Sequence, residues 1–254
     1  MLLLIDAGNT LVKWALVSDA ADRDVPWSDF GAVPHEDLQS LTENWRNSAR
    51  GTTIERILIS NVAGSQMRDR LEYLLQSINS ASGSIEWFKS MPSLGGVRNC
   101  YVDFGQLGCD RFAAMIGAHA LFPGQALIVA TCGTATTIDA VAKDGTFVGG
   151  MILPGLRLMT SSLAGNTAQL PQVSASDTSF SPFADNTGSA IVTGCITAQA
   201  GAIERAVGEH ERSSGKVQCV LSGGAASFIA PYLSVTHRIV DNLVLIGLHT
   251  IATG

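Results

Sequence analysis

The stretch Leu2-Leu3-Leu4-Ile5-Asp6-Ala7-Gly8-Asn9-Thr10 opens the chain with an apolar run that stops at a polar turn. A short apolar run bounded by turn residues predicts a buried strand. The segment from Lys13 to Val17 then predicts the returning strand of a hairpin. A turn rich in glycine and threonine exposes backbone N–H groups that can hold phosphate oxygens, although the same residues also suit a plain hairpin.

The second half of the chain repeats this order. Residues 126–130 form an apolar run that ends in Thr131-Cys132-Gly133-Thr134-Ala135, and residues 136–141 predict the next strand. A further apolar run, residues 217–221, ends in Ser222-Gly223-Gly224-Ala225-Ala226. Three such turns in one chain favour a phosphate-binding site over three unrelated hairpins.

The repeat predicts two related lobes. Pro123-Gly124 interrupts the pattern between the halves, so we expect an N-terminal lobe of residues 1–122 and a C-terminal lobe of residues 123–254. Asp241 is the expected N-cap of a final apolar helix. Further helices are predicted over residues 38–50, 66–78, 110–121, 155–163 and 188–207.

The composition is that of a folded protein with a sizeable core: 46% of the 254 residues are hydrophobic and 15% are charged. The net charge of −6 argues against nucleic acid as the main partner, because basic groups supply most of the affinity there. No apolar stretch approaches the roughly 20 residues that span a bilayer, and no signal peptide is visible. We therefore expect a cytoplasmic protein with no membrane partner. The five cysteines include no Cys-x-x-Cys pair, which predicts reduced thiols.

Several common catalytic motifs are absent. The sequence contains no Gly-x-x-x-x-Gly-Lys-[Ser/Thr] loop, no Gly-x-Gly-x-x-Gly after a strand, no Gly-x-Ser-x-Gly elbow and no His-Glu-x-x-His. The strand-end turns therefore remain as the candidate site. A carboxylate such as Asp6 can hold Mg²⁺, directly or through water, and Lys13 can reach a terminal phosphate.

Several motifs, in order along nearly the whole chain, carry a resemblance to a known family. Residues 6–10 resemble the first phosphate motif of the actin-like and sugar-kinase superfamily, and Gly108-Cys109-Asp110-Arg111 resembles the Gly-x-Asp-Arg motif of type III pantothenate kinases. The remaining matches to that family are Gly133 to Asp139, Gly149 to Gly155, Asn186-Thr187 and Asn242 to Leu248.

The resemblance implies a fold and an activity. The fold is α/β, with two ribonuclease-H-like lobes of the actin-like ATPase type, each a mixed sheet flanked by helices. The activity is transfer of the γ-phosphate of ATP, bound with Mg²⁺, to the primary hydroxyl of pantothenate, the first step of coenzyme A synthesis. The family forms homodimers, and the small-residue helix over 188–207 is the candidate interface or packs only within its own lobe.

Carried over residue by residue, the family's site assigns four roles. Asp110 is the proton acceptor for the substrate hydroxyl, and Asp6 is the candidate magnesium ligand. The residues that hold ATP are Asp6, Ala7, Gly8, Asn9, Thr10, Leu11, Val12, Lys13 and Thr134. The residues that line the pantothenate pocket are Tyr101, Gly108, Cys109, Asp110, Arg111 and Thr187. Without the family context, Asp110 and Arg111 also suit a helix N-terminal acid beside a surface ion pair.

Two positions depart from the family pattern. Thr131 stands where the family often has an aspartate that binds a monovalent cation. A neutral hydroxyl is a poorer cation ligand, so we expect a weakened or altered potassium or ammonium site. Cys109 stands where alanine is common, and no partner that would make it a catalytic thiol is identifiable.

Two other functions compete with pantothenate phosphorylation. One is a kinase or phosphohydrolase of the actin-like superfamily that acts on a sugar or polyphosphate. The other is a non-catalytic, nucleotide-responsive regulator, because some members of the family were first described as accessory factors for gene expression. Gly108 to Arg111 together with Tyr101 favours pantothenate.

Overall fold

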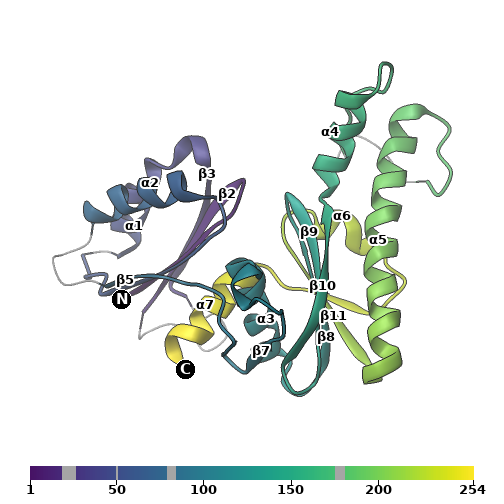
Figure 1. The fold of residues 1–254 in the computed structure, drawn as a ribbon. Helices are drawn as coiled ribbons and strands as arrows, with labels where there is room; N and C mark the ends of the chain where they lie inside the picture. Colours follow the sequence, from purple (N-terminus) through teal and green to yellow (C-terminus); the bar gives the residue numbers. More distant parts are fainter. Residues whose placement is uncertain (19–26, 50, 79–83, 175–180) are drawn as a thin grey trace. The chain divides into compact units, whose positions relative to one another are not determined.

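The computed structural model describes residues 1–18, 27–49, 51–78, 84–174 and 181–254. The chain forms two compact units, one of Met1–Leu121 with Asn242–Gly254 and one of Phe122–Asp241 (Figure 1). The last helix thus belongs to the first unit, whereas the sequence repeat assigned it to the C-terminal lobe.

The first unit is built on a five-stranded mixed sheet in the order β3-β2-β1-β4-β5. Its strands are β1 Leu2–Ala7, β2 Leu11–Val17, β3 Asp29–Pro34, β4 Arg56–Asn61 and β5 Ser84–Trp87. The central strand β1 pairs antiparallel with β2 and parallel with β4, while β2–β3 is antiparallel and β4–β5 is parallel. The predicted opening hairpin is therefore present.

Helices cover both faces of this sheet (Figure 1). Because strand side chains alternate, Leu3 and Ile5 enter a core with residues of α1 and α2, while Asp6 points to the opposite face. There α3 and α7 pack on β4 and β1. The helices are α1 Ser40–Ala49, α2 Ser65–Gln76, α3 Cys109–Leu121 and α7 Leu243–Thr253.

Two glycines let α3 and α7 approach closely. A Cβ on Gly247 would overlap the carbonyl oxygen of Ala113, and a Cβ on Gly117 would lie 2.7 Å from the carbonyl oxygen of Leu243. This contact between residues far apart in sequence holds α7 in the first unit. The helix is capped by Asn242, in a left-handed conformation with φ of 56°, and the prediction of Asp241 as its N-cap is wrong.

The second unit repeats the plan of the first. Its sheet runs β12-β11-β8-β9-β10, with β8–β9 and β9–β10 antiparallel and β8–β11 and β11–β12 parallel. The strands are β8 Ala126–Cys132, β9 Ala135–Val141, β10 Thr146–Pro154, β11 Val217–Ser222 and β12 His237–Ile239. The predicted fold class, two lobes that each contain a mixed sheet flanked by helices, is confirmed.

The helices of the second unit include the longest of the described chain, α5 Thr187–Ser214. It runs beyond the predicted end at residue 207, where His210 is buried and its Nε2 lies 3.0 Å from the Val141 carbonyl oxygen of the sheet. Its N-cap Asn186 accepts a hydrogen bond from the Ser189 N–H at 2.9 Å. The other helices of this unit are α4 Leu156–Asn166, α6 Ala226–Ile229 and the short η3 Ala230–Tyr232.

Smaller elements lie between β5 and α3, where the sequence predicted irregular structure. They are β6 Ser93–Leu94, β7 Val97–Asn99 and the 3₁₀ helix η2 Phe104–Gln106, and a further 3₁₀ turn, η1 His35–Asp37, follows β3. Part of the predicted long loop over 164–185 forms the end of α4, and residues 175–180 lie outside the described residues. No described helix is long and apolar enough to cross a membrane.

Candidate active site

Asp6 occupies the end of the central strand of the first unit. In the sheet register it lies between Lys13 on β2 and Ser60 on β4. Its Oδ1 atom is buried and has no hydrogen-bond partner among the described residues. A buried carboxylate oxygen without a partner is costly for a folded protein, so a ligand or cation that satisfies it would be favoured.

The electrostatic environment of Asp6 also favours a bound cation. Burial and the nearby Asp110 carboxyl raise the pKa of Asp6 to about 7, while Lys13 opposes this shift. Two carboxyl groups that repel each other suit a divalent cation, and Mg²⁺ commonly takes one or two carboxylates together with substrate phosphates. Within the described residues, no three acidic, His or Cys side chains gather to hold a metal unaided. The residues present therefore fit a magnesium ion that arrives with the nucleotide.

Asp110 lies in the first turn of α3. Its Oδ1 accepts a hydrogen bond from the Arg111 N–H at 2.7 Å, and burial raises the pKa of the carboxyl while Arg111 lowers it. A Cβ on Gly108 would come within 2.7 Å of the same Oδ1, which explains why a glycine precedes the helix. Asp110 is a half-buried carboxylate with one oxygen fixed and the side chain held near Asp6.

Cys109 connects the start of α3 to the end of β4. Its Sγ lies 3.4 Å from the Ser60 Oγ and 3.6 Å from the Asn61 carbonyl oxygen. Burial raises the pKa of the thiol, so the sulfur stays protonated at neutral pH. The residue positions the helix and has no nucleophilic character. Ser60, which is fully buried, has no sequence motif that would have identified it.

Arg111 and Tyr101 form the other side of the site. Arg111 is 6% exposed, and both of its terminal nitrogens lie 3.3 Å from the Tyr101 Oη. Buried Asn99 fixes the preceding loop: its Oδ1 accepts from the Tyr101 N–H and its Nδ2 donates to the Phe104 carbonyl oxygen, both at 3.1 Å. A guanidinium held in this way can bind a carboxylate.

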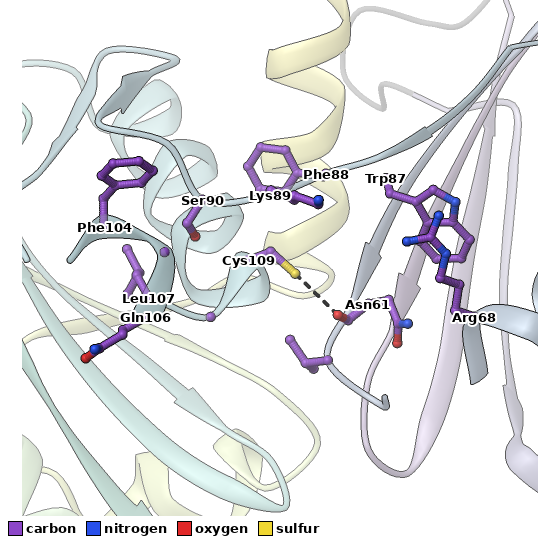
Figure 2. Close-up of a pocket in the computed structure, with 13 residues that line it drawn as sticks. Asn61, Arg68, Trp87, Phe88, Lys89, Ser90, Phe104, Gln106, Leu107 and Cys109 are labelled. Atoms are coloured by element: carbon purple, nitrogen blue, oxygen red, sulfur yellow. Dashed lines mark hydrogen bonds between the residues drawn. The ribbon is translucent and has the colours of Figure 1, made fainter. Parts of the chain in front are cut away.

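A pocket of about 480 Å³ lies beside the start of α3 (Figure 2). Gly108 and Cys109 form part of its wall, but Asp110, Arg111 and Tyr101 are not among its described lining residues. The other lining residues are Asn61, Val62, Arg68, Trp87, Phe88, Lys89, Ser90, Phe104, Gly105, Gln106 and Leu107. No sequence signal identified this pocket, because its walls come from separate segments without a shared motif.

The first strand-end turn is shaped by two contacts to Gly8. The Gly8 N–H donates to the Leu11 carbonyl oxygen at 3.1 Å, and the His35 Nε2 lies 2.9 Å from the Gly8 carbonyl oxygen. Asn9, Thr10 and Leu11 are exposed, whereas Ala7 and Val12 are buried partners in the hairpin. The exposed tip is therefore the part that a phosphate can contact.

The second unit carries the corresponding turn, at Gly133-Thr134. The Gly155 N–H donates to the Thr134 carbonyl oxygen at 3.0 Å, and a Cβ on Gly155 would overlap that turn. Gly223, with φ of 90°, also packs closely: a Cβ there would lie 2.5 Å from the Cys132 carbonyl oxygen, so the third predicted turn lies against the second. Thr187, the first residue of α5, is exposed in the same unit.

Two hydroxyl groups near this turn were not proposed as site residues from the sequence. The Oγ1 atoms of Thr136 and Thr137 on β9 are buried; the Thr136 hydroxyl interacts with the Cys132 thiol, whereas the Thr137 hydroxyl makes no hydrogen bond within the described part of the chain. Both belong to the start of β9, just after the Gly133-Thr134 turn. A buried polar atom without a protein partner is often hydrogen-bonded to a ligand or to water.

Comparisons with known proteins agree with one another. The family model described as type III pantothenate kinase matches residues 2–209. Two type III pantothenate kinases, from Herminiimonas arsenicoxydans and Janthinobacterium sp. (strain Marseille), are 55% and 56% identical, and each alignment covers 99% of this chain and 97% of the relative.

Solved structures support the fold. A Campylobacter jejuni protein assigned to the Baf family of transcriptional activators matches with a TM-score of 0.63 and 18% identity, covering 98% of this chain and 96% of that one. A Sinorhizobium meliloti protein assigned as a 2-dehydro-3-deoxygalactonokinase matches with a TM-score of 0.57 and 12% identity, covering 99% and 97%. At these identities the likeness concerns the fold alone.

Proposed function

We propose, since this chain belongs to the type III pantothenate kinase family, that Asp110 is the base of its phosphoryl transfer. The chain is a kinase: it phosphorylates pantothenate with ATP for coenzyme A biosynthesis. The observation that carries the assignment of the base is the half-buried Asp110 carboxylate, held between Asp6 and the Arg111–Tyr101 pair.

Asp110 accepts the proton of the pantothenate hydroxyl as that oxygen attacks the γ-phosphorus. One carboxylate oxygen is fixed by the Arg111 N–H, which leaves the other for the substrate. Phosphoryl transfer depends mainly on positioning and charge neutralisation, so a correctly placed carboxylate is sufficient as the base. The raised pKa keeps Asp110 closer to the pH at which it must accept a proton.

Arg111 and Tyr101 bind the carboxylate of pantothenate. The guanidinium offers two parallel donors, a geometry that matches a carboxylate better than an ammonium does. Tyr101 keeps both terminal nitrogens of Arg111 in place before substrate arrives. Gly108, Cys109 and Thr187 complete the proposed substrate set.

ATP is held by the turn of residues 6–10, continued through Leu11 and Val12 to Lys13, and by Thr134 of the second unit. Backbone N–H groups of the exposed tip bind phosphate oxygens, and Lys13 neutralises a terminal phosphate. Asp6 would hold Mg²⁺, with Asp110 nearby. When bound, this ion neutralises charge on the transferred phosphate. With Thr131 in place of an acid, a monovalent cation site is weak.

A homodimer is part of this proposal. The outer face of α5 carries a row of small, exposed residues: Ala190, Gly194, Thr197, Ala198 and Gly201. Such residues let two helices approach closely. Sedimentation should give a dimer at micromolar protein concentration, and a monomer there would remove this part of the proposal.

An ADP-release assay with a panel of acceptors tests the function. Pantothenate should give ADP together with phosphorylated pantothenate, identified by mass spectrometry, whereas sugars should give only the background seen without acceptor. Release with a sugar instead of pantothenate would indicate another kinase of this superfamily. No release with any acceptor would favour a regulator.

A further inference from the structure

Gln199 is a fully buried amide on α5 that lies outside the residues proposed to bind the substrates. In the second unit, α5 runs along the sheet and beside α4 (Figure 1). The Gln199 side chain reaches the end of β10, where its Nε2 donates to the Pro154 carbonyl oxygen at 2.6 Å. The same nitrogen lies 3.1 Å from the Met159 Sδ on α4. One buried glutamine therefore joins three elements at the point where β10 leads into α4.

A single peptide group connects this contact to the Gly133-Thr134 turn. The Pro154 carbonyl and the Gly155 N–H belong to the same peptide bond, and in a planar trans peptide they point in opposite directions. The carbonyl accepts from Gln199, while the N–H donates to the Thr134 carbonyl oxygen at 3.0 Å. The plane of this peptide is therefore held from both sides, by the glutamine amide and by the turn.

The close packing of Gly155 leaves the turn little freedom to adjust. A Cβ on Gly155 would overlap the Gly133 carbonyl oxygen and would lie 2.5 Å from the Thr134 carbonyl oxygen. Backbone groups packed this closely transmit displacements to one another, because no empty space absorbs them. A rotation of the Pro154–Gly155 peptide would therefore move Thr134.

Packing alone does not explain a glutamine at this position. The Gln199 Oε1 is buried and has no hydrogen-bond partner among the described residues. An unpaired buried amide oxygen carries a desolvation cost, whereas an unbranched methionine would fill a similar space without it. The donor at Nε2 is thus the part of the side chain that the surrounding structure uses.

We propose that Gln199 is a positioning residue for ATP: through the Pro154–Gly155 peptide it holds the Gly133-Thr134 turn in the orientation that binds the nucleotide. It acts through the backbone and does not touch ATP. The two hydrogen bonds of this chain run in the same direction and polarise each other, which strengthens both. The inference rests on the proposed function, in which Thr134 holds ATP.

Gln199→Met removes the donor and keeps an unbranched side chain of similar length. Isothermal titration calorimetry with a non-hydrolysable ATP analogue and Mg²⁺ measures the effect on binding. The Kd of the variant should rise by roughly three- to tenfold, the range for loss of one neutral hydrogen bond. In steady-state kinetics KM for ATP should rise by a similar factor. Because pantothenate does not depend on this turn, KM for pantothenate and kcat should stay within about twofold of the wild type.

Gln199→Glu separates positioning from packing, because glutamate has the same shape. Its carboxylate would place an oxygen against the Pro154 carbonyl oxygen and repel it, whereas its protonated form can donate an O–H there. The two groups that the Gln199 amide contacts, the Pro154 carbonyl and the Met159 thioether, do not titrate. The ratio of the variant's Kd to the wild-type Kd should therefore be largest near about pH 8 and fall as the glutamate is protonated toward about pH 5.5. The same ratio for Gln199→Met should not change with pH.

Gln218→Met is the matched control. This glutamine on β11 of the same unit also donates from its Nε2 to a backbone carbonyl oxygen, that of Cys219, at 2.8 Å. The variant loses the same kind of hydrogen bond at a strand that does not include the Pro154–Gly155 peptide. It should bind the ATP analogue with the wild-type Kd.

Two results would overturn the inference. The first is a wild-type Kd for the ATP analogue in Gln199→Met. The second is a Kd ratio for Gln199→Glu that does not change with pH, which would reduce Gln199 to a packing residue. A wild-type protein that binds no ATP analogue would contradict the proposed function and the inference together, so the two failures give different results.

Discussion

The two units have the same strand order and directions, yet the ends of their central strands differ in chemistry. In the first unit Asp6 stands two residues before Gly8 and pairs with Lys13 and Ser60. In the second unit Thr131 stands two residues before Gly133 and pairs with Thr137 and Ser222. Each central strand ends in a hairpin turn, but only the first has an acid and a lysine at these positions.

The proposed binding of ATP gives this difference a physical reason. Backbone N–H groups and hydroxyls bind phosphate oxygens without adding negative charge, whereas each carboxylate repels the phosphates unless a cation lies between them. One turn with an acid and a lysine, and one turn with neutral hydroxyls such as Thr136 and Thr137, is the combination that limits repulsion. The comparison predicts that substitutions in the first turn cost more than those in the second.

The largest effect in this comparison should come from Asp6→Asn. Removal of the carboxylate should lower kcat by about 10²–10³, the range found for loss of one preorganised electrostatic group. Thr131→Val, at the corresponding position of the second unit, should cost less than about tenfold. Steady-state kinetics at saturating magnesium measure both. Equal losses would remove the asymmetry between the units.

Arg111→Lys should act on substrate binding. The lysine keeps the charge but loses the paired donors, so KM for pantothenate should rise by roughly 10–100-fold with a smaller change in kcat. Tyr101→Phe, which removes only the oxygen that holds Arg111, should raise KM in the same direction by less. A fall in kcat at constant KM would assign Arg111 to the chemical step instead.

The buried acid also predicts a pH-dependent stability. Because the pKa of Asp6 rises from 3.8 to about 7 on folding, the unfolded chain releases this proton first. Its contribution to stability is therefore full below pH 4 and is lost as the pH rises to 7. At pH 7, the free energy of unfolding of Asp6→Asn should exceed that of the wild type by roughly 2–4 kcal/mol, since a tenfold change in proton affinity is worth about 1.4 kcal/mol.

Denaturant unfolding in metal-free buffer measures this difference. The gain of Asp6→Asn should shrink toward zero as the pH approaches 4. A constant difference between pH 4 and pH 8 would show that Asp6 does not titrate as described. If Asp6 titrates as described, Asp6→Asn is more stable than the wild type at pH 7 and also less active. Stability and activity often oppose each other in this way at a functional residue.

The smallest effect is expected from potassium. Because Thr131 supplies no carboxylate, replacing sodium by potassium or ammonium should change kcat/KM by less than about twofold. An essential ion bound by a carboxylate of the protein would change kcat/KM far more. Titration of potassium into the standard kinase assay measures this. Activity that is absent without potassium and saturates at low millimolar concentration would contradict the expectation.

Features with a local cause were predictable from the sequence. The hairpin over Leu2 to Val17 and the helices α2 and α3 follow from apolar spacing and turn residues. Tyr101 and Arg111, ten residues apart, were expected at one site through a family motif, and they are in direct contact.

Features that depend on tertiary packing were not predictable. α7 is apolar on most of its surface, so nothing in its own sequence says which unit it joins; the close approach of Gly117 and Gly247 determines it. Lys89 and Ser90 carry no periodic or motif signal, and only the fold brings them beside Phe104. Ser60 likewise gains a role only when the start of α3 packs on β4.

The measurement that tests the central claim most directly is the turnover of Asp110→Asn with pantothenate and ATP. Loss of the proton acceptor should lower kcat by about 10²–10⁴ while the protein stays folded. Cys109→Ala, one residue away, is the matched control and should keep near-normal turnover, since its thiol contacts Ser60 and Asn61 and alanine leaves the backbone at this position in place. A folded Asp110→Asn enzyme with near-normal kcat would contradict the assignment of Asp110 as the base.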